Sequence, residues 1–168
     1  FVGIYFTNYM KILIVLGTIF LTSFIKPNPA IALGLEESVR TVSFDTTDKT
    51  VVITKAQIKR GKRLFANACA NCHVGGVTKP DPNIGLDMTA LRFATPPKDN
   101  IVNLVAYFKD PVTYDGLRSI SELHPSIKSA DLFPKMRFLT DEDLFSIAGY
   151  VLYQYNVLGD RWGGGKVY

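Results

Sequence analysis

The sequence predicts a mostly α-helical domain with a small N-terminal β-hairpin and long irregular loops. Apolar residues recur at helical spacing in three segments that begin near residues 55, 100 and 141, and each segment follows a residue type that caps helix N-termini. The first of these segments ends in Cys69-Ala70-Asn71-Cys72-His73. This motif indicates that the helices surround a covalently attached cofactor.

The N-terminal part of the chain has the pattern of an export signal. Residues 12–25 form an apolar run of 14 behind Lys11, and the small-x-small cleavage signature Ala30-Ile31-Ala32 follows. We therefore expect a cleavable signal peptide over residues 1–32 and a single mature domain over residues 33–168. The run is shorter than the roughly 20 residues that a membrane-spanning helix needs, so an uncleaved anchor is the minor alternative.

The mature chain begins with a predicted hairpin and a predicted helix. β-Branched residues in 40–44 and 50–54 flank the turn-forming stretch 45–49. Thr54-Lys55-Ala56-Gln57 is a capping box that opens the helix. The positions expected to be buried are Ile58, Leu64, Phe65 and Ala68. The charged face carries Lys55, Lys59, Arg60, Lys62 and Arg63, and is either a solvated surface or a docking surface for an acidic partner.

Cys-x-x-Cys-His is the motif that carries covalent haem. The thiols of Cys69 and Cys72 are spaced to form two thioether bonds to one haem c, and His73 is then held under the iron as proximal ligand. A thioredoxin-like redox pair would need a βαβ context, which the sequence lacks. A Cys2His2 zinc site that includes His124 is disfavoured, because the adjacent residues Cys72 and His73 would have to bind the same tetrahedral ion.

The remaining elements alternate between loops and helices. The Gly- and Pro-rich residues 74–97 predict a loop that wraps one edge of the haem, and residues 110–129 are rich in turns. A second helix begins near Asp99 or Asn100, with the apolar stripe Ile101, Leu104, Val105 and Phe108. Thr140 begins the clearest helix, with the stripe Leu144, Ile147, Ala148, Val151, Leu152 and Tyr155. The Gly-rich residues 158–168 predict a C-terminal docking tail.

Two helices of the sequence resemble the crossed first and last helices of class I cytochromes c. Gly61 and Phe65 precede Cys69 by eight and four residues, and the late helix carries Gly149-Tyr150. Collinear segments along the mature chain further resemble the cytochrome c-550 family of photosystem II. They are residues 61–65, 69–76, 94–97, 114–116, 124–126, 133–137 and 162–168. The resemblance implies a class I cytochrome c fold with extended haem-wrapping loops.

Three side chains compete for the sixth position on the iron: His124, Met136 and Met88. Residue chemistry alone leaves the choice open, because methionine is also a common filler of hydrophobic cores. The resemblance implies His124, in the setting His124-Pro125-Ser126. Two imidazoles would give a low-potential haem without an open coordination position. For the second ring nitrogen of His73, we expect a carbonyl acceptor within residues 79–82.

The resemblance implies an extrinsic haem subunit of photosystem II that stabilises the oxygen-evolving complex and its calcium and chloride requirement, and that is not an enzyme. The implied partners are the photosystem II core and other extrinsic lumenal subunits. The implied location is the thylakoid lumen of a cyanobacterium or red-lineage plastid, peripheral to the membrane. The alternative function is a diffusible one-electron carrier of the lumen or periplasm.

The charge of the chain argues against nucleic-acid binding. The formal net charge is +4, and two of these charges are Lys11 and Lys26 of the predicted leader, which leaves +2 for the mature chain. A domain with this charge has no strong basic field that would contact phosphates.

Overall fold

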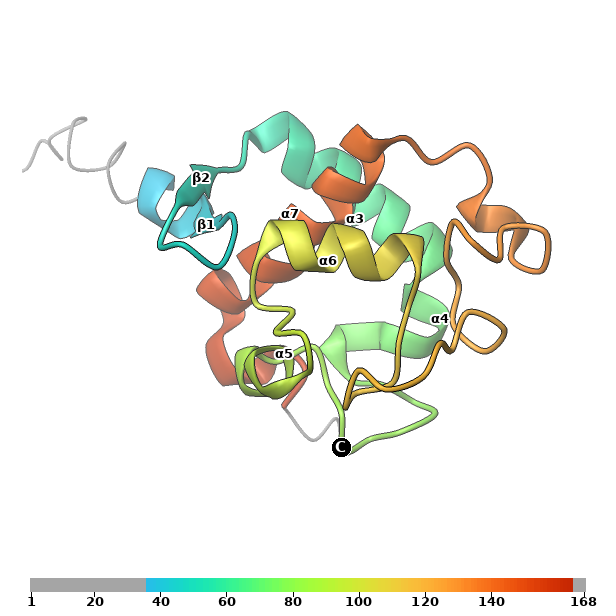
Figure 1. The fold of residues 1–168 in the computed structure, drawn as a ribbon. Helices are drawn as coiled ribbons and strands as arrows, with labels where there is room; N and C mark the ends of the chain where they lie inside the picture. Colours follow the sequence, from blue (N-terminus) through green and yellow to red (C-terminus); the bar gives the residue numbers. More distant parts are fainter. Residues whose placement is uncertain (1–35, 165–168) are drawn as a thin grey trace, which may run out of the picture. The chain divides into compact units, whose positions relative to one another are not determined.

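The computed structural model describes residues 36–164 (Figure 1). The predicted leader, residues 1–32, and the last part of the predicted tail, residues 165–168, lie outside the described residues. The elements are β1 (Thr41–Ser43), β2 (Thr50–Val52), α3 (Lys55–Ala68), α4 (Ala70–His73), the 3-10 turn η1 (Val74–Gly76), α5 (Met88–Phe93), α6 (Ile101–Lys109), η2 (Pro134–Met136), α7 (Asp141–Leu158) and η3 (Gly159–Arg161). None of the described helices is long and apolar enough to cross a membrane.

The predicted hairpin is confirmed as a two-stranded antiparallel sheet. Val42 of β1 pairs with Val51 of β2. The turn is held by the Phe44 N–H, which donates to the Lys49 carbonyl at 2.8 Å, and by the Asp45 carboxylate, which accepts from Thr47. The Asn156 amide on α7 donates to the carbonyls of Val39 and Thr41 at 3.0 Å each, which ties the start of the sheet to the last helix.

The three predicted helices are also confirmed, together with their N-terminal caps. Thr54 and Gln57 form a reciprocal capping box on α3, and Thr140 and Asp143 form another on α7. Asn100 caps α6 by accepting from the Asn103 N–H at 3.0 Å. Side chains that accept hydrogen bonds from the first turn satisfy donors that a helix otherwise leaves unpaired, so each helix begins at the expected residue.

Helices α3 and α7 cross in close contact, and glycine makes this crossing possible. A Cβ atom added at Gly61 would lie 1.9 Å from the backbone oxygen of Ser146, so no side chain fits there. At Gly149 an added Cβ would lie 3.0–3.2 Å from the side chain of Ile53. The Gly61 contact is therefore the one that agrees with the predicted crossing of the first and last helices, and Gly149 instead gives room to Ile53, which precedes α3.

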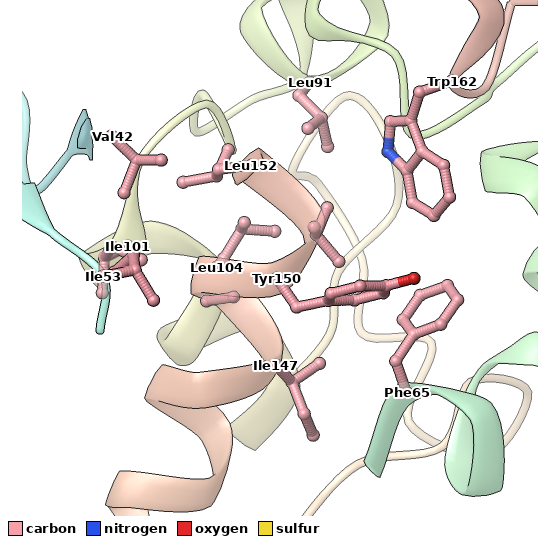
Figure 2. Close-up of a cluster of buried hydrophobic side chains, with 12 residues drawn as sticks. Val42, Ile53, Phe65, Leu91, Ile101, Leu104, Ile147, Tyr150, Leu152 and Trp162 are labelled. Carbon is pink, nitrogen blue, oxygen red and sulfur yellow. The ribbon is translucent and has the colours of Figure 1, made fainter. Parts of the chain in front are cut away.

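The core lies between α3, α6 and α7 and contains part of each predicted apolar stripe (Figure 2). Five other predicted positions are only partly buried and pack against it: Ile58, Leu64, Val105, Phe108 and Tyr155. Phe65 of α3, Tyr150 of α7 and Trp162 form an aromatic cluster at one side of it, with ring centroids 5.4 Å apart for Phe65 and Tyr150 and 5.8 Å apart for Phe65 and Trp162. The other buried members are Val42, Ile53, Leu91, Ile101, Leu104, Ile147, Ala148, Val151 and Leu152.

Two regions differ from the sequence expectations. The segment 74–97, expected as a loop, contains η1 and the short helix α5, whose N-terminus is capped by Asp87 through the Ala90 N–H at 2.9 Å. In the predicted tail, Trp162 is only 3% exposed and belongs to the core. The Gly163 N–H donates to the Gly75 carbonyl at 3.0 Å, so this part of the tail packs on the segment that follows His73.

Candidate haem site

The Cys-x-x-Cys-His motif lies where the first helix ends and turns. Cys69 ends α3 and begins α4, and its carbonyl accepts from the N–H groups of Cys72 at 3.1 Å and His73 at 3.0 Å. Both thiols are free; Cys69 is half-buried and Cys72 is exposed. Burial, and then the neighbouring Cys72, raise the pKa of Cys69 to about 12, so this thiol stays protonated in the protein without haem.

His73 is oriented by the residues directly after it. Its Nδ1 lies 3.1 Å from the hydroxyl oxygen of Thr78. The Lys79 N–H donates to the Cys72 carbonyl at 2.9 Å, which closes the loop that carries Thr78 back over the motif. Residues 79–82, the candidate for a backbone acceptor, are not the partners of this ring: the structure instead places the Thr78 hydroxyl at Nδ1 and gives His73 a hydrogen bond with the Val77 backbone.

His124 is held by the turn that contains it. Its backbone N–H donates to the Ile120 carbonyl at 2.8 Å, and its Nδ1 donates to the Pro125 carbonyl at 3.0 Å. A buried pair of hydroxyl groups stabilises this turn: the oxygens of Ser126 and Ser129 lie 2.7 Å apart. Because a carbonyl can only accept, the Nδ1 of neutral His124 carries the proton and its Nε2 has a free lone pair.

The structure brings His73 and His124 together. Their ring centroids are 6.1 Å apart and the ring planes are inclined by 51°. Among the hydrogen bonds of residues 36–164, both rings use Nδ1 and neither uses Nε2. Each imidazole thus keeps one nitrogen available as a ligand while the other is fixed by the protein, as is usual for histidines that bind metals.

The separation of the two rings fits one metal ion between them. An imidazole nitrogen lies about 2.0 Å from a bound metal, and a five-membered ring with bonds of about 1.33 Å has its centroid about 1.1 Å from each atom. Two imidazoles on opposite sides of one ion would therefore have centroids about 6.2 Å apart. The observed distance agrees with this value, so the residues present fit a haem iron ligated by both histidines.

Burial favours the neutral form of both imidazoles. Burial lowers the pKa of His73, and a hydrogen bond with the Val77 backbone opposes this shift. Burial lowers the pKa of His124 to about 4, and the positive charges of His73 and Lys98 act in the same direction. Neutral imidazole is the form that ligates a metal ion.

The two competing methionines lie in short elements. Met136 is 3% exposed within η2, and Met88 packs against the hydrophobic core at the start of α5. Across the described part of the chain, no group of three or more His, Cys, Asp or Glu side chains could hold a metal ion. This finding disfavours a Cys2His2 zinc site built from the cysteines and histidines of the motif and His124.

Two residues of the site are not singled out by the sequence pattern. The Tyr107 ring of α6 meets His124 edge-on, with centroids 5.0 Å apart. Lys98 places its ammonium 4.8 Å from the centroid of the Tyr107 ring. The available signal was weak: Tyr107 lies three residues after Leu104, at the edge of the apolar stripe of α6.

Trp162 also carries a polar group without a protein partner. Its Nε1 is buried and has no hydrogen-bond acceptor among the described residues. A buried indole N–H usually has an acceptor. This orphan donor is a second sign, besides the facing imidazoles, that the described residues fit a further group with acceptor atoms.

Comparisons with known proteins agree with the geometry. Residues 33–168 match the cytochrome c-550 domain family. The chain is 62% identical over 154 residues to photosystem II extrinsic protein V of Emiliania huxleyi, which covers 92% of this chain and 93% of that protein. The protein of the same name from Trichormus variabilis is 55% identical over 155 residues, with coverages of 92% and 95%.

Two solved structures share the fold. Cytochrome c549 superposes with a TM-score of 0.74 at 50% identity and covers 76% of this chain and 98% of its own. The PsbV2 cytochrome of Thermosynechococcus elongatus superposes with a TM-score of 0.62 at 35% identity, with coverages of 73% and 87%. The predicted class I cytochrome c fold is thereby confirmed, and the chain belongs to the cytochrome c-550 family.

Proposed function

We propose that this protein is an extrinsic subunit of photosystem II that carries one covalent, low-potential haem c and stabilises the oxygen-evolving complex and its calcium and chloride requirement. Cys69 and Cys72 would form the thioether bonds, and His73 and His124 would be the axial ligands. The observation that carries the proposal is the pair of neighbouring imidazoles, whose ring centroids are 6.1 Å apart and one of which directly follows Cys-x-x-Cys. The names of the relatives, photosystem II extrinsic protein V, support the assembly.

When bound, the haem supplies a one-electron redox centre. The chain itself fixes the orientation of both histidine rings through Nδ1, which contacts the Thr78 hydroxyl in His73 and the Pro125 carbonyl in His124. These contacts leave each Nε2 available as a ligand. With His73 and His124 both holding the iron, no ligand position would remain for a substrate, which supports a structural or electron-transferring function over an enzymatic one. Imidazole on both sides favours ferric iron over ferrous iron, which lowers the potential.

Docking to the lumenal side of photosystem II is attributed to two surfaces. The first is the basic face of α3, where Lys59, Lys62 and Arg63 are exposed. Arg60 of the same face is engaged by the Asp143 carboxylate of α7 and contributes less free charge. The second is the C-terminal segment, residues 158–168, in which Trp162 is buried in the core and residues 165–168 lie outside the described residues. Exposed charges of one sign favour encounter with a surface of the opposite sign and make the association dependent on salt.

A rebinding assay tests the basic face of α3. We expect the triple variant Lys59→Glu, Lys62→Glu and Arg63→Glu to bind photosystem II particles depleted of extrinsic subunits roughly tenfold or more weakly at low salt, since exposed ion pairs contribute about 0.2–1 kcal/mol each. The difference should shrink as the ionic strength rises.

The control carries the same charge change on other exposed sites, Lys79→Glu, Arg118→Glu and Lys135→Glu. Oxygen evolution restored by added calcium and chloride is measured in the same particles. Equal weakening by both triple variants would remove the α3 face from the docking assignment. Wild-type protein that neither binds the particles nor alters their ion requirement would contradict the proposed function itself.

A further inference from the structure

Lys98 is a buried lysine without an acidic partner. Only 7% of the residue is exposed, and its backbone is fixed by the Lys98 N–H, which donates to the Leu91 carbonyl at 2.7 Å. Within residues 36–164 its Nζ makes no hydrogen bond and no ion pair; the ammonium instead lies over the ring of Tyr107, 4.8 Å from the centroid. Lysines usually extend their ammonium group into water, so the inward direction of this side chain requires a reason.

Tyr107 presents a second polar group without an acceptor at the same place. Its ring contacts Lys98 on one face and His124 along its edge, with 5.0 Å between the centroids of the Tyr107 and His124 rings. The hydrogen bonds of the described residues include none from the Tyr107 hydroxyl. Burial raises the pKa of this hydroxyl to about 12, so it remains a donor at physiological pH.

The two groups have the same chemical requirement. Lys98 is buried and Tyr107 is half-buried, and the cation–π contact alone gives neither the ammonium nor the hydroxyl an acceptor. The described residues supply no carboxylate to either group. One anion with two acceptor oxygens would satisfy both donors at once, which is the geometry of a carboxylate.

We propose that Lys98 and Tyr107 together bind one carboxylate of the haem, on the side of His124. The inference rests on the haem assignment in the proposed function, because the haem is the group that brings carboxylates next to His124. Lys98 then has two roles: it neutralises that carboxylate, and its positive charge favours the reduced haem. The low potential of a bis-histidine haem is thus partly raised by a residue outside the ligand set.

The test uses the haem-loaded protein and two substitutions that remove one donor each. Lys98→Gln removes the charge, and Tyr107→Phe removes only the hydroxyl and keeps the ring that packs on His124. Lys62→Gln on the exposed face of α3 is the matched control, since it makes the same charge change at a solvated site. Resonance Raman spectroscopy of the carboxylate-bending bands of the haem and the midpoint potential are measured for each variant.

We expect Lys98→Gln and Tyr107→Phe each to shift a carboxylate-bending band, and Lys98→Gln also to lower the midpoint potential, while Lys62→Gln changes neither. Unshifted bands in both variants would overturn the inference. A lower potential in Lys98→Gln without a band shift would likewise overturn it, since Lys98 would then act only as a distant charge. Because Tyr107→Phe preserves the packing of the site, it tests the inference even where Lys98→Gln does not fold.

Near-infrared magnetic circular dichroism of the same samples keeps this inference separate from the proposed function. Bis-histidine ligation in all samples with unshifted carboxylate bands would overturn the Lys98 and Tyr107 assignment alone. A wild-type spectrum that lacks the bis-histidine band would overturn the proposed ligand set, whatever the carboxylate bands show.

Discussion

Each histidine of the site has two nitrogens with different tasks. Nδ1 of His73 is engaged by Thr78 and Nδ1 of His124 by the Pro125 carbonyl, and the Nε2 atoms remain available. Only His73 is marked by its sequence neighbours, through the Cys-x-x-Cys motif. His124 is 51 residues further along, and from residue chemistry it competes with Met88 and Met136. The fold brings the His124 ring to 6.1 Å from that of His73, a proximity that depends on the turn after α6.

Asp143 illustrates how one side chain can serve two elements. Its carboxylate accepts from the Arg60 guanidinium of α3 and from the Thr140 N–H that precedes α7. The hydrogen bond with Arg60, and to a smaller extent those with Thr140, hold the pKa of Asp143 below its usual value. The carboxylate therefore stabilises the folded state above the pKa of the unfolded chain, about 3.9, and this contribution is lost as the pH falls through the lower pKa of the folded state.

We expect Asp143→Asn to lower the free energy of unfolding by about 1–2 kcal/mol at pH 7, because it weakens hydrogen bonds that involve charged groups. Solvent around the partly exposed Arg60 keeps the loss from being larger. The deficit should disappear at low pH, where the wild-type carboxyl is itself protonated. Urea unfolding of the haem-loaded protein at a series of pH values measures this difference in stability. The control is Asp131→Asn, which makes the same change at an exposed site. A deficit that does not change with pH would contradict the assigned ionic role.

At the scale of elements, the crossing of α3 and α7 positions the motif, since α3 ends at Cys69. Gly61 at this crossing and Gly149, which lies against Ile53 instead, provide a pair of contrasting tests. Gly61→Ala places Cβ against the Ser146 backbone, which cannot yield without separating the helices, and should cost about 3 kcal/mol or more.

Gly149→Ala meets only the side chain of Ile53, which can adjust, and gains helix propensity of about 1 kcal/mol, so we expect a net change below about 1.5 kcal/mol. Urea unfolding followed by far-ultraviolet circular dichroism compares the two. Equal losses of stability would show that the helices do not approach most closely at Gly61.

The C-terminal segment combines a core element with a candidate docking element. Trp162 is buried beside Phe65 and Tyr150, so removing residues 160–168 would delete a core side chain as well as the end of the chain. Removing only residues 165–168 avoids this. We expect that truncation to change the unfolding free energy by less than about 0.5 kcal/mol and to weaken rebinding to photosystem II particles.

Trp162→Ala, by contrast, should cost about 3–5 kcal/mol of stability because it leaves a cavity in the aromatic cluster. Both variants are measured by urea unfolding and by the same rebinding assay, with the haem absorption spectrum as a check on the site. If the truncated protein rebinds like the wild type, residues 165–168 have no part in docking.

For the whole molecule, sequence patterns predict most of the fold. The caps at Thr54, Asn100 and Thr140 predict where the three long helices begin, because capping depends on a few adjacent residues. The tertiary role of the glycine-rich segments was not predictable in this way. Gly75 and Gly163 are distant in sequence, and their backbone hydrogen bond exists only once the chain after α7 folds back.

The site shows the same division between local and tertiary information. Cys69, Cys72 and His73 follow from one local motif. Lys98 and Tyr107 belong to no motif, and their significance comes from their packing on each other and on His124 without protein acceptors, which only the folded structure reveals.

The central proposal is that His73 and His124 are the two axial ligands of one haem. Near-infrared magnetic circular dichroism of the oxidised, haem-loaded protein tests it most directly, because the position of the charge-transfer band separates bis-histidine from histidine–methionine ligation. We expect the bis-histidine band in the wild-type protein and its loss in the His124→Met variant. A histidine–methionine band in the wild type would contradict the proposal, transfer the sixth position to Met136 or Met88, and make a diffusible electron carrier the better reading of the chain.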